Sequence, residues 1–136
     1  MSRSGYVDGL DNWTLICWRG AVASSLRGKR GQRLLNELAD AMDAMPEKRL
    51  IANDLEAGGD VCALGAVGRV RGLDMQEIDP EDSERVSEVF DIADALAKEI
   101  VFENDEGTFH DETPEQRWSR MRKWVARNLA EENLAA

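Results

Sequence analysis

Residues 49–72, RLIANDLEAGGDVCALGAVGRVRG, decide the fold that we predict for this chain. The stretch is rich in Val, Cys, Ala, Leu and Gly, and these are among the residue types most often buried in protein cores. We therefore expect it to form the centre of the hydrophobic core. The same residue types fill the cores of functionally unrelated proteins, so this stretch predicts an architecture and no particular chemistry.

A small β-hairpin is predicted near residues 49–64. Gly58 and Gly59 stand between two short apolar runs, and a glycine pair in that position is a turn signal. A helix over residues 49–56 is the alternative, because apolar residues there also recur four positions apart. An isolated hairpin is barely stable in water, so we expect this one to lie against helices.

Helices are predicted on both sides of the hairpin. After it, residues 63–71 should form a short buried helix whose glycines allow close packing. Before it, residues 12–27 place Leu, Trp and Val at spacings of three and four, the period of one helix face. The glycines of residues 28–31, GKRG, indicate a turn, and a second helix follows over about residues 32–45, before Pro46.

Two longer helices are predicted in the rest of the chain. Asp79 and Pro80 supply the N-cap and the first residue of a helix that runs to about residue 102. Residues 103–112, ENDEGTFHDE, should then form a polar loop. Residues 113–116, TPEQ, begin the last helix with a capping box. Its apolar face comprises Trp118, Met121, Val125 and Leu129.

The chain of 136 residues fits one domain, which we expect to be mainly α (α+β), with four to five helices and the hairpin. Residues 1–11 are expected to form a flexible N-terminal arm and residues 131–136 a frayed tail. Apolar residues make up 43% and charged residues 32%, as in globular rather than disordered chains. The net charge of −10 disfavours adhesion of the whole molecule to nucleic acid or to an anionic membrane.

The sequence predicts a cytoplasmic protein with free thiols. Both cysteines, Cys17 and Cys62, lie in apolar sequence, and no hydrophobic export signal is visible after the first residues. No apolar window approaches the roughly 20 residues that a membrane span requires. A reducing compartment, in which cysteines stay unpaired, fits these features.

From residue 62 onwards the chain contains three short motifs. They are Cys62-Ala63-Leu64-Gly65-Ala66, the pair Asn104-Asp105 after an apolar helix, and the closing Thr113-Pro114-Glu115. With these motifs the chain resembles a group of small proteins of unknown function from bacteria and prophages. Residues 18–32, WRGAVASSLRGKRGQ, are similar to the phage-borne members of that group. The resemblance implies a shared fold and an origin in a mobile element, and it brings no established activity.

One set of residues could support catalysis. Cys62 could act as a nucleophile if its pKa were lowered, with His110, the only histidine, as the base and Asp111 to orient the imidazole. The alternative is that Cys62 is a small buried hydrophobic residue, as is usual in apolar sequence. We predict no metal site and no cofactor, because the acids of residues 103–112 lack the spacing of a calcium loop and Cys and His are too few for zinc.

Charged residues are strongly clustered. Residues 74–115 contain sixteen acids against Arg85 and Lys98, a net charge of −14, so the remaining residues carry +4. The basic residues form two clusters, which are Arg27, Lys29, Arg30 and Arg33, and Arg117, Arg120, Arg122, Lys123 and Arg127. Either the acidic and basic helices pair within the molecule, or they leave an acidic and a basic face for partners.

Macromolecular binding is the function that this layout predicts. The expected contact residues are Glu81, Asp82, Glu84, Glu88, Asp91, Lys29, Arg30 and a partly exposed Trp124. The partner would be a protein or nucleoprotein complex of the host or its defence, whose nucleic-acid-binding surface meets the carboxylates. The alternatives are an enzyme that uses Cys62 with His110, and a weak nucleic-acid binder through the basic clusters. We predict no stable complex with duplex DNA, because the acids oppose the phosphates. The sequence predicts no oligomeric state.

Overall fold

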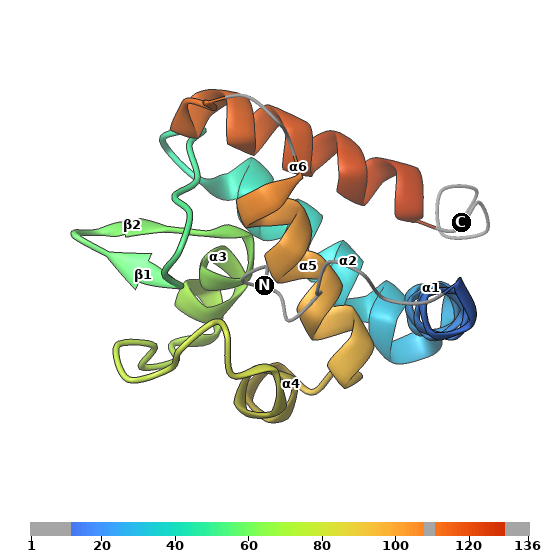
Figure 1. Ribbon diagram of the computed structural model, residues 1–136. Coiled ribbons are helices and arrows are strands. Elements are labelled where there is room, and N and C mark those ends of the chain that lie inside the picture. Colours follow the sequence, from blue (N-terminus) through green and yellow to red (C-terminus); the bar gives the residue numbers. More distant parts are fainter. Residues whose placement is uncertain (1–11, 108–110, 130–136) are drawn as a thin grey trace.

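Helices dominate the computed structural model, which describes residues 12–107 and 111–129, apart from the side chains of Asn12 and Leu15. The six helices of this part are α1 (Asn12–Arg27), α2 (Lys29–Ala44), α3 (Ala63–Arg71), α4 (Ser83–Phe90), α5 (Asp94–Glu106) and α6 (Pro114–Asn128). Between α2 and α3, β1 (Glu56–Ala57) pairs antiparallel with β2 (Asp60–Val61) (Figure 1). The prediction of a mainly helical α+β fold with a small hairpin is confirmed. The predicted arm over residues 1–11 and tail over residues 131–136 lie outside the described residues.

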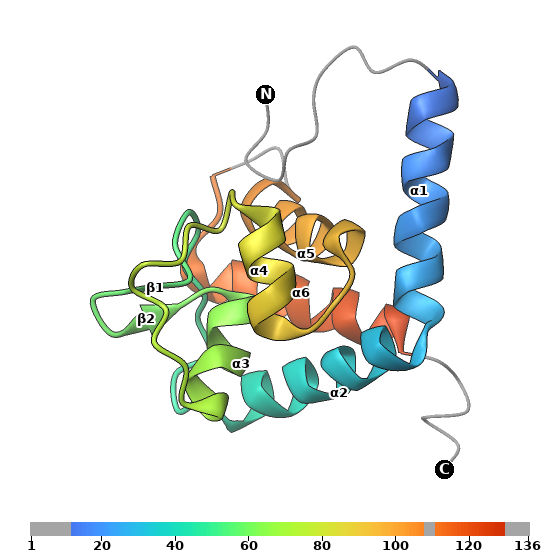
Figure 2. The ribbon, with the colours of Figure 1, turned by 90° about the horizontal axis from the view of Figure 1, so that it is seen from below.

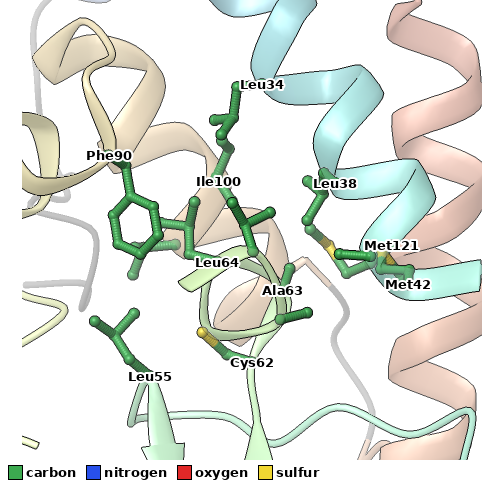
Figure 3. Close-up of a cluster of buried hydrophobic side chains, with 14 of the residues drawn as sticks. Leu34, Leu38, Met42, Leu55, Cys62, Ala63, Leu64, Phe90, Ile100 and Met121 are labelled. Atoms are coloured by element: carbon green, nitrogen blue, oxygen red, sulfur yellow. The ribbon is translucent and has the colours of Figure 1, made fainter. Parts of the chain in front are cut away.

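The core forms around α3, within the stretch that the sequence predicts as its centre. All of residues 63–68 are buried, and side chains from α2, α4, α5 and α6 pack around them (Figure 3). Fully buried large side chains include Leu34, Leu38, Met42, Leu64, Phe90, Ile100 and Met121. Burial of one such side chain stabilises the fold by about 1.5–3 kcal/mol. This cluster is therefore the main source of stability.

Glycines allow the neighbours of α3 to approach its backbone, as predicted. A Cβ atom at Gly65 would overlap the carbonyl oxygen of Leu55. A Cβ atom at Gly68 would overlap the sulfur of Met75. The segments before and after α3 therefore lie directly against it. Substitution of Gly65 would force the Leu55 backbone away from α3, whereas substitution of Gly68 would require the flexible Met75 side chain to shift.

The second helix begins earlier than predicted. α2 starts at Lys29, so the turn is confined to Gly28 and does not span residues 28–31. Gly31 lies inside the helix, where a Cβ atom would overlap the carbonyl oxygen of Ser25 in α1. The glycine that resembles a turn signal in the sequence is thus a packing residue between α1 and α2.

The hairpin is shorter than predicted. Its two turn glycines both adopt positive φ angles, of 58° and 86°, but residues 49–55 form neither a strand nor a helix. The backbone N–H of Leu50 donates to the carbonyl oxygen of Pro114, and that of Ile51 donates to Val61, both at 3.0 Å. Hydrogen bonds to the start of α6 and to β2 therefore satisfy backbone N–H groups of this segment, in place of a regular strand ladder.

The long helix predicted over residues 79–102 is two helices. Asp91 adopts the left-handed conformation, with φ 57° and ψ 54°, and ends α4. The N-cap of α4 is Asp82, whose carboxylate accepts the N–H of Arg85 at 3.2 Å. Asp79, the predicted N-cap, accepts an N–H within the preceding turn instead. This break raises the number of helices in the described residues to six from the predicted four to five.

The end of α5 and the start of α6 differ in how well local signals predict them. α5 continues to Glu106 and so includes part of the predicted polar loop over residues 103–112. α6 begins with the predicted capping box: the Thr113 hydroxyl accepts the N–H of Gln116 at 3.1 Å, and the Gln116 side chain accepts the N–H of Thr113 at 3.0 Å. No described helix is both long and apolar enough to cross a membrane.

α1 stands at one edge of the molecule, where it packs against α5 and meets the start of α2 (Figure 2). On its inner side, Val22 is buried and the ring of Trp18 lies 4.8 Å from the ammonium of Lys98. On its outer side, Trp13 is 73% exposed and Ile16 is 60% exposed. α1 therefore has one apolar face in the molecule and a second one in solvent.

Candidate functional site

The Cys62 thiol is buried at the N-terminus of α3. It is the N-cap residue, and its sulfur accepts a hydrogen bond from the N–H of Gly65 at 3.3 Å. The side chain lies in the same cluster as Leu55 and Leu64 (Figure 3). Burial raises the pKa of the Cys62 thiol to about 12, so the thiol is protonated at neutral pH. It acts as a helix cap and a small core residue.

The space beside Cys62 is too small for a substrate. The cavity there has a volume of about 10 Å³ and is lined by Asp54 and Asp105, among others. That volume holds about one water molecule. Asp111 is exposed, and His110 lies outside the described residues. The predicted cysteine–histidine arrangement therefore stays a prediction.

A buried polar junction joins α3, α5, α6 and the segment before the hairpin; it comprises Asn104, Glu112, Arg117 and Arg120. Asn104 is 2% exposed. Its Oδ1 accepts the N–H of Ala63, the first residue of α3, at 3.1 Å. Its Nδ2 donates to the carbonyl oxygen of Ile51 at 3.0 Å and to the carboxylate of Asp105 at 2.7 Å. One amide side chain thus links three separate segments.

Two arginines of α6 complete the polar junction. Arg120 donates to both oxygens of Glu112, at 2.7 and 3.0 Å, and Arg117 lies 3.4 Å from the same carboxylate. Arg117 also donates to the carbonyl oxygens of Asn104, at 3.0 Å, and of Leu50, at 3.2 Å. The Glu112 side chain is only 8% exposed. Its charge is tolerated there because two cations and their hydrogen bonds compensate it.

The predicted polar loop over residues 103–112 does not leave Asn104 and Glu112 in solvent: Asn104 lies in α5 and is 2% exposed, and the Glu112 side chain is 8% exposed. A signal for Asn104 is present in the sequence, since it continues the helical spacing of three and four from Ile100 and Val101. Glu112 and its partners carry no such local pattern.

Within the described residues, no group of three or more His, Cys, Asp and Glu side chains is placed to hold a metal ion.

An acidic arc covers α4 and the loop before it, along the lower edge of the molecule in Figure 1. We define it by the eight acids between residues 74 and 91, which are Asp74, Glu77, Asp79, Glu81, Asp82, Glu84, Glu88 and Asp91. All eight are exposed, and Arg85 is the only base in this range. The acidic arc therefore presents a net charge of −7 to solvent.

A basic corner lies at the junction of α1 and α2; we define it as Arg27, Lys29, Arg30 and Arg33, all of which are exposed. Arg30 lies 3.2 Å from Asp91, so the corner adjoins one end of the acidic arc. Two of its arginines line a groove of about 210 Å³, together with Arg71 and Phe90. Arg71 itself is held by Glu37, through contacts of 2.7 and 2.9 Å.

Three of the five basic residues of α6, Arg117, Arg120 and Arg122, are engaged within the molecule, whereas Lys123 and Arg127 are exposed. Arg122 donates to Asp43 of α2 at 2.8 and 3.0 Å, and Arg120 lies 3.8 Å from Glu103 of α5. These cations are therefore engaged within the molecule by acids of α2 and α5. The acidic arc lies on α4 and the loop before it, so the acids that contact these arginines do not belong to the arc.

The prediction of a partly exposed contact at Trp124 is wrong. Trp124 is 6% exposed, because it lies beside Met121 on the side of α6 that packs against α2. Trp118, a predicted core residue, is half-buried, and its indole N–H donates to the carbonyl oxygen of Met42 at 3.3 Å. The tryptophan that α1 exposes is Trp13.

No protein-family model, no curated protein and no solved structure matches this chain. The functional argument therefore rests on the geometry of these surfaces. The polar junction satisfies its own groups and holds the fold together, whereas the acidic arc and the basic corner face solvent. The exposed acidic arc and basic corner can each attract a partner of opposite charge. The Cys62 thiol, in contrast, is buried and protonated.

Proposed function

We propose that the protein acts by macromolecular binding, with the acidic arc as its contact surface for a cationic partner. The observation that carries this proposal is the exposure of all eight carboxylates of the arc, which have a net charge of −7 with Arg85. A surface of one sign attracts partners of the opposite sign and speeds their association. The nucleic-acid-binding surface of a protein or nucleoprotein complex has the complementary charge, because it neutralises phosphates.

The state of Cys62 favours binding over catalysis. A nucleophilic cysteine needs a thiolate and access to its substrate. The Cys62 thiol is buried, its pKa is raised to about 12, and the adjoining cavity measures about 10 Å³. We therefore rank an enzyme that uses Cys62 below a binding protein.

The biological setting that we propose is the cytoplasm of a bacterial host, with the protein encoded by a phage or prophage. This setting comes from the resemblance of its three motifs to such proteins. The motif residues lie at positions that hold the fold: Cys62 caps α3, Asn104 belongs to the polar junction and Thr113 caps α6. The resemblance thus supports a shared fold, while the acidic arc supports the proposed role of modulating a host or defence complex.

A pull-down from bacterial lysate with the tagged protein tests this function. We expect a DNA-binding protein to be retained at low salt and released as the ionic strength rises. The double variant Glu84→Gln with Glu88→Gln should lose most of this retention. The matched control, Asp40→Asn with Asp54→Asn, removes the same charge at exposed positions outside the arc and should retain the partner.

Competition with DNA gives the second arm of the test. The wild-type protein should displace a labelled duplex from the captured partner, and equal displacement by the arc variant would contradict the proposal. Alone, the protein should form no stable complex with the duplex at physiological ionic strength. Tight binding of the duplex that is lost when Lys29 and Arg30 become Ala would assign the function to the basic corner instead.

A further inference from the structure

Three arginines line one groove between α2, the end of α3 and the end of α4. Arg30 and Arg33 come from α2, and Arg71 is the last residue of α3. Two apolar residues that also line the groove, Leu34 and Phe90, are each 1% exposed. The groove has a volume of about 210 Å³, below the roughly 300–1,000 Å³ of pockets for drug-sized ligands. It therefore has room for one small ligand, between cationic side chains and a buried apolar surface.

The residues around Arg71 hold its guanidinium in one orientation. Its Nε and Nη2 atoms donate to the two carboxylate oxygens of Glu37, at 2.9 and 2.7 Å, and its Nη1 atom donates to the carbonyl oxygen of Phe90 at 3.3 Å. The guanidinium also lies 5.9 Å from the centre of the Phe90 ring. An arginine has five N–H groups, and these hydrogen bonds use three of them. Among the described residues the other two have no such partner, so a preorganised arginine can still donate to a ligand.

The other two arginines of the groove are neighbours on α2. Arg30 and Arg33 are three residues apart, so they lie on the same face of the helix with Cβ atoms about 5–6 Å apart. Within the part of the chain that the structure describes, no carboxylate pairs with Arg33. Arg30 lies 3.2 Å from Asp91, and the two side chains are 57% and 74% exposed. An ion pair this exposed adds little stability, so a doubly charged anion can take the place of the Asp91 carboxylate.

We propose that this groove binds the phosphate group of a small phosphate monoester, and that the Asp91 carboxylate pairs with Arg30 only until the ligand replaces it. The charged residues that line the groove are the three arginines, Glu37 and Asp91, with a net charge of +1. Once Asp91 turns into solvent, the net charge is +2. A phosphate monoester carries about −1.5 to −2 at pH 7 and so matches it. Arginine suits this ligand, because its planar fork donates to two phosphate oxygens at once.

A small dianion fits this position better than a nucleic acid does. Asp91 belongs to the acidic arc, whose net charge is −7, so the arc begins at the edge of the groove. Carboxylates of the arc repel any polyanion that extends beyond the groove, over a Debye length of about 8 Å. A monoester concentrates its charge on one phosphate, whereas a nucleic acid has one charge per phosphate and places the next phosphates outside the groove. The charge layout therefore favours a small ligand over DNA.

Titration of the ¹⁵N-labelled protein with phenyl phosphate, followed by NMR, tests the site independently of the function proposed for the acidic arc. We expect saturable shifts at the backbone amides of Arg71 and Ile92, which line the groove. Arg33→Gln should raise the dissociation constant at least about tenfold, because it removes charge-assisted hydrogen bonds to the phosphate. The matched control is Arg27→Gln, which removes an exposed base of the same basic corner outside the groove and should change it less than about twofold. The absence of saturable shifts, or equal losses in the two variants, would overturn the proposal.

Asp91→Asn tests whether the carboxylate competes with the ligand. Asparagine tolerates the left-handed conformation that Asp91 adopts, with φ 57°, so the end of α4 should stay as it is. Without the competing charge, phenyl phosphate should bind at least about threefold more tightly. Unchanged or weaker binding would overturn the role of Asp91.

A diester distinguishes a small monoester from a nucleic-acid backbone as the ligand. Methyl phenyl phosphate has the same ring as phenyl phosphate and a single negative charge, and it should bind at least about tenfold more weakly. Equal binding of the two compounds would overturn a monoester site and assign the groove to phosphodiesters.

Discussion

The two basic clusters of this chain lie in opposite environments. On α6, Arg117 and Arg120 converge on the carboxylate of Glu112, which is 8% exposed. At the basic corner, Arg27 and Lys29 are exposed to solvent. The arginines of the first cluster that contact Glu112 join secondary-structure elements within the molecule, and the second cluster is available to a partner.

The difference comes from what the fold places beside each cluster. α6 packs against the acid-rich end of α5 and against α2, so its arginines meet carboxylates and free carbonyl groups. The start of α2 follows a helix without acids, and the first acid after the corner is Glu37. At the corner, Arg30 meets Asp91, but both side chains of that pair stay exposed. A run of basic residues therefore predicts a basic surface only where the fold does not bury it against acids.

Removal of Arg117 should have the largest effect on stability. Arg117→Ala leaves the carbonyl oxygen of Leu50 without this donor, that of Asn104 with Arg120 as its remaining side-chain donor, and Glu112 with one cation fewer. Buried polar groups without partners cost about 1–3 kcal/mol each, so we expect the free energy of unfolding to fall by about 3 kcal/mol in urea denaturation. Lys123→Ala, exposed on the same helix, should change it by less than about 0.5 kcal/mol. Equal losses would remove the distinction between buried and exposed bases.

Asn104→Ala should have the next largest effect. It removes the acceptor for the N–H of Ala63 and a donor to the carbonyl oxygen of Ile51, and we expect a loss of about 2 kcal/mol. Asn36→Ala is the control, because Asn36 is exposed and its side chain donates only to the carbonyl oxygen of Gln32 in its own helix. Amide hydrogen exchange at Ala63 gives a direct readout, since the loss of its acceptor should speed exchange there. Unchanged exchange would contradict the role of Asn104.

The parts of the fold that were predicted correctly have local signals. The capping box over residues 113–116 combines a hydroxyl, a proline and a glutamine at fixed positions, and α6 begins there. The bounds of α1 and α3 follow from helical spacing and from a glycine at the C-cap of α3. The acids of the arc were also predictable as exposed, because carboxylates without buried partners stay in water.

The parts that were missed depend on contacts between distant residues. Gly31 and a turn glycine look alike in the sequence, and only the neighbouring carbonyl of Ser25 distinguishes them. The polar junction joins Arg117 to Leu50, which are 67 residues apart, so no local pattern indicates it. The break at Asp91 requires a left-handed conformation at a residue other than glycine. Tertiary packing decided each of these features.

The two glycines of the α1–α2 region should respond to alanine in opposite directions. Gly31→Ala forces a Cβ atom onto the carbonyl oxygen of Ser25 and should destabilise the fold by about 1–3 kcal/mol. Gly20→Ala adds a Cβ atom where nothing lies within 4 Å and should stabilise the fold by about 0.5–1 kcal/mol. Urea denaturation of the two variants measures both changes. A loss of stability for Gly20→Ala would show that this glycine packs within its own chain.

The ion pair between Asp43 and Arg122, on the rim of the α2–α6 contact, should have the smallest effect. The hydrogen bond from Arg122 holds the pKa of Asp43 below its usual value. A pKa that is lowered on folding means that the ionised carboxylate stabilises the fold at neutral pH and that this contribution is lost as the pH falls through the folded-state pKa. Because the Asp43 side chain is 53% exposed, a double-mutant cycle with Asp43→Asn and Arg122→Gln should give a coupling of about 0.2–1 kcal/mol at neutral pH. If the coupling energy stays the same in acid, where Asp43 is protonated, the interaction does not depend on the charge of Asp43. That outcome would contradict the prediction.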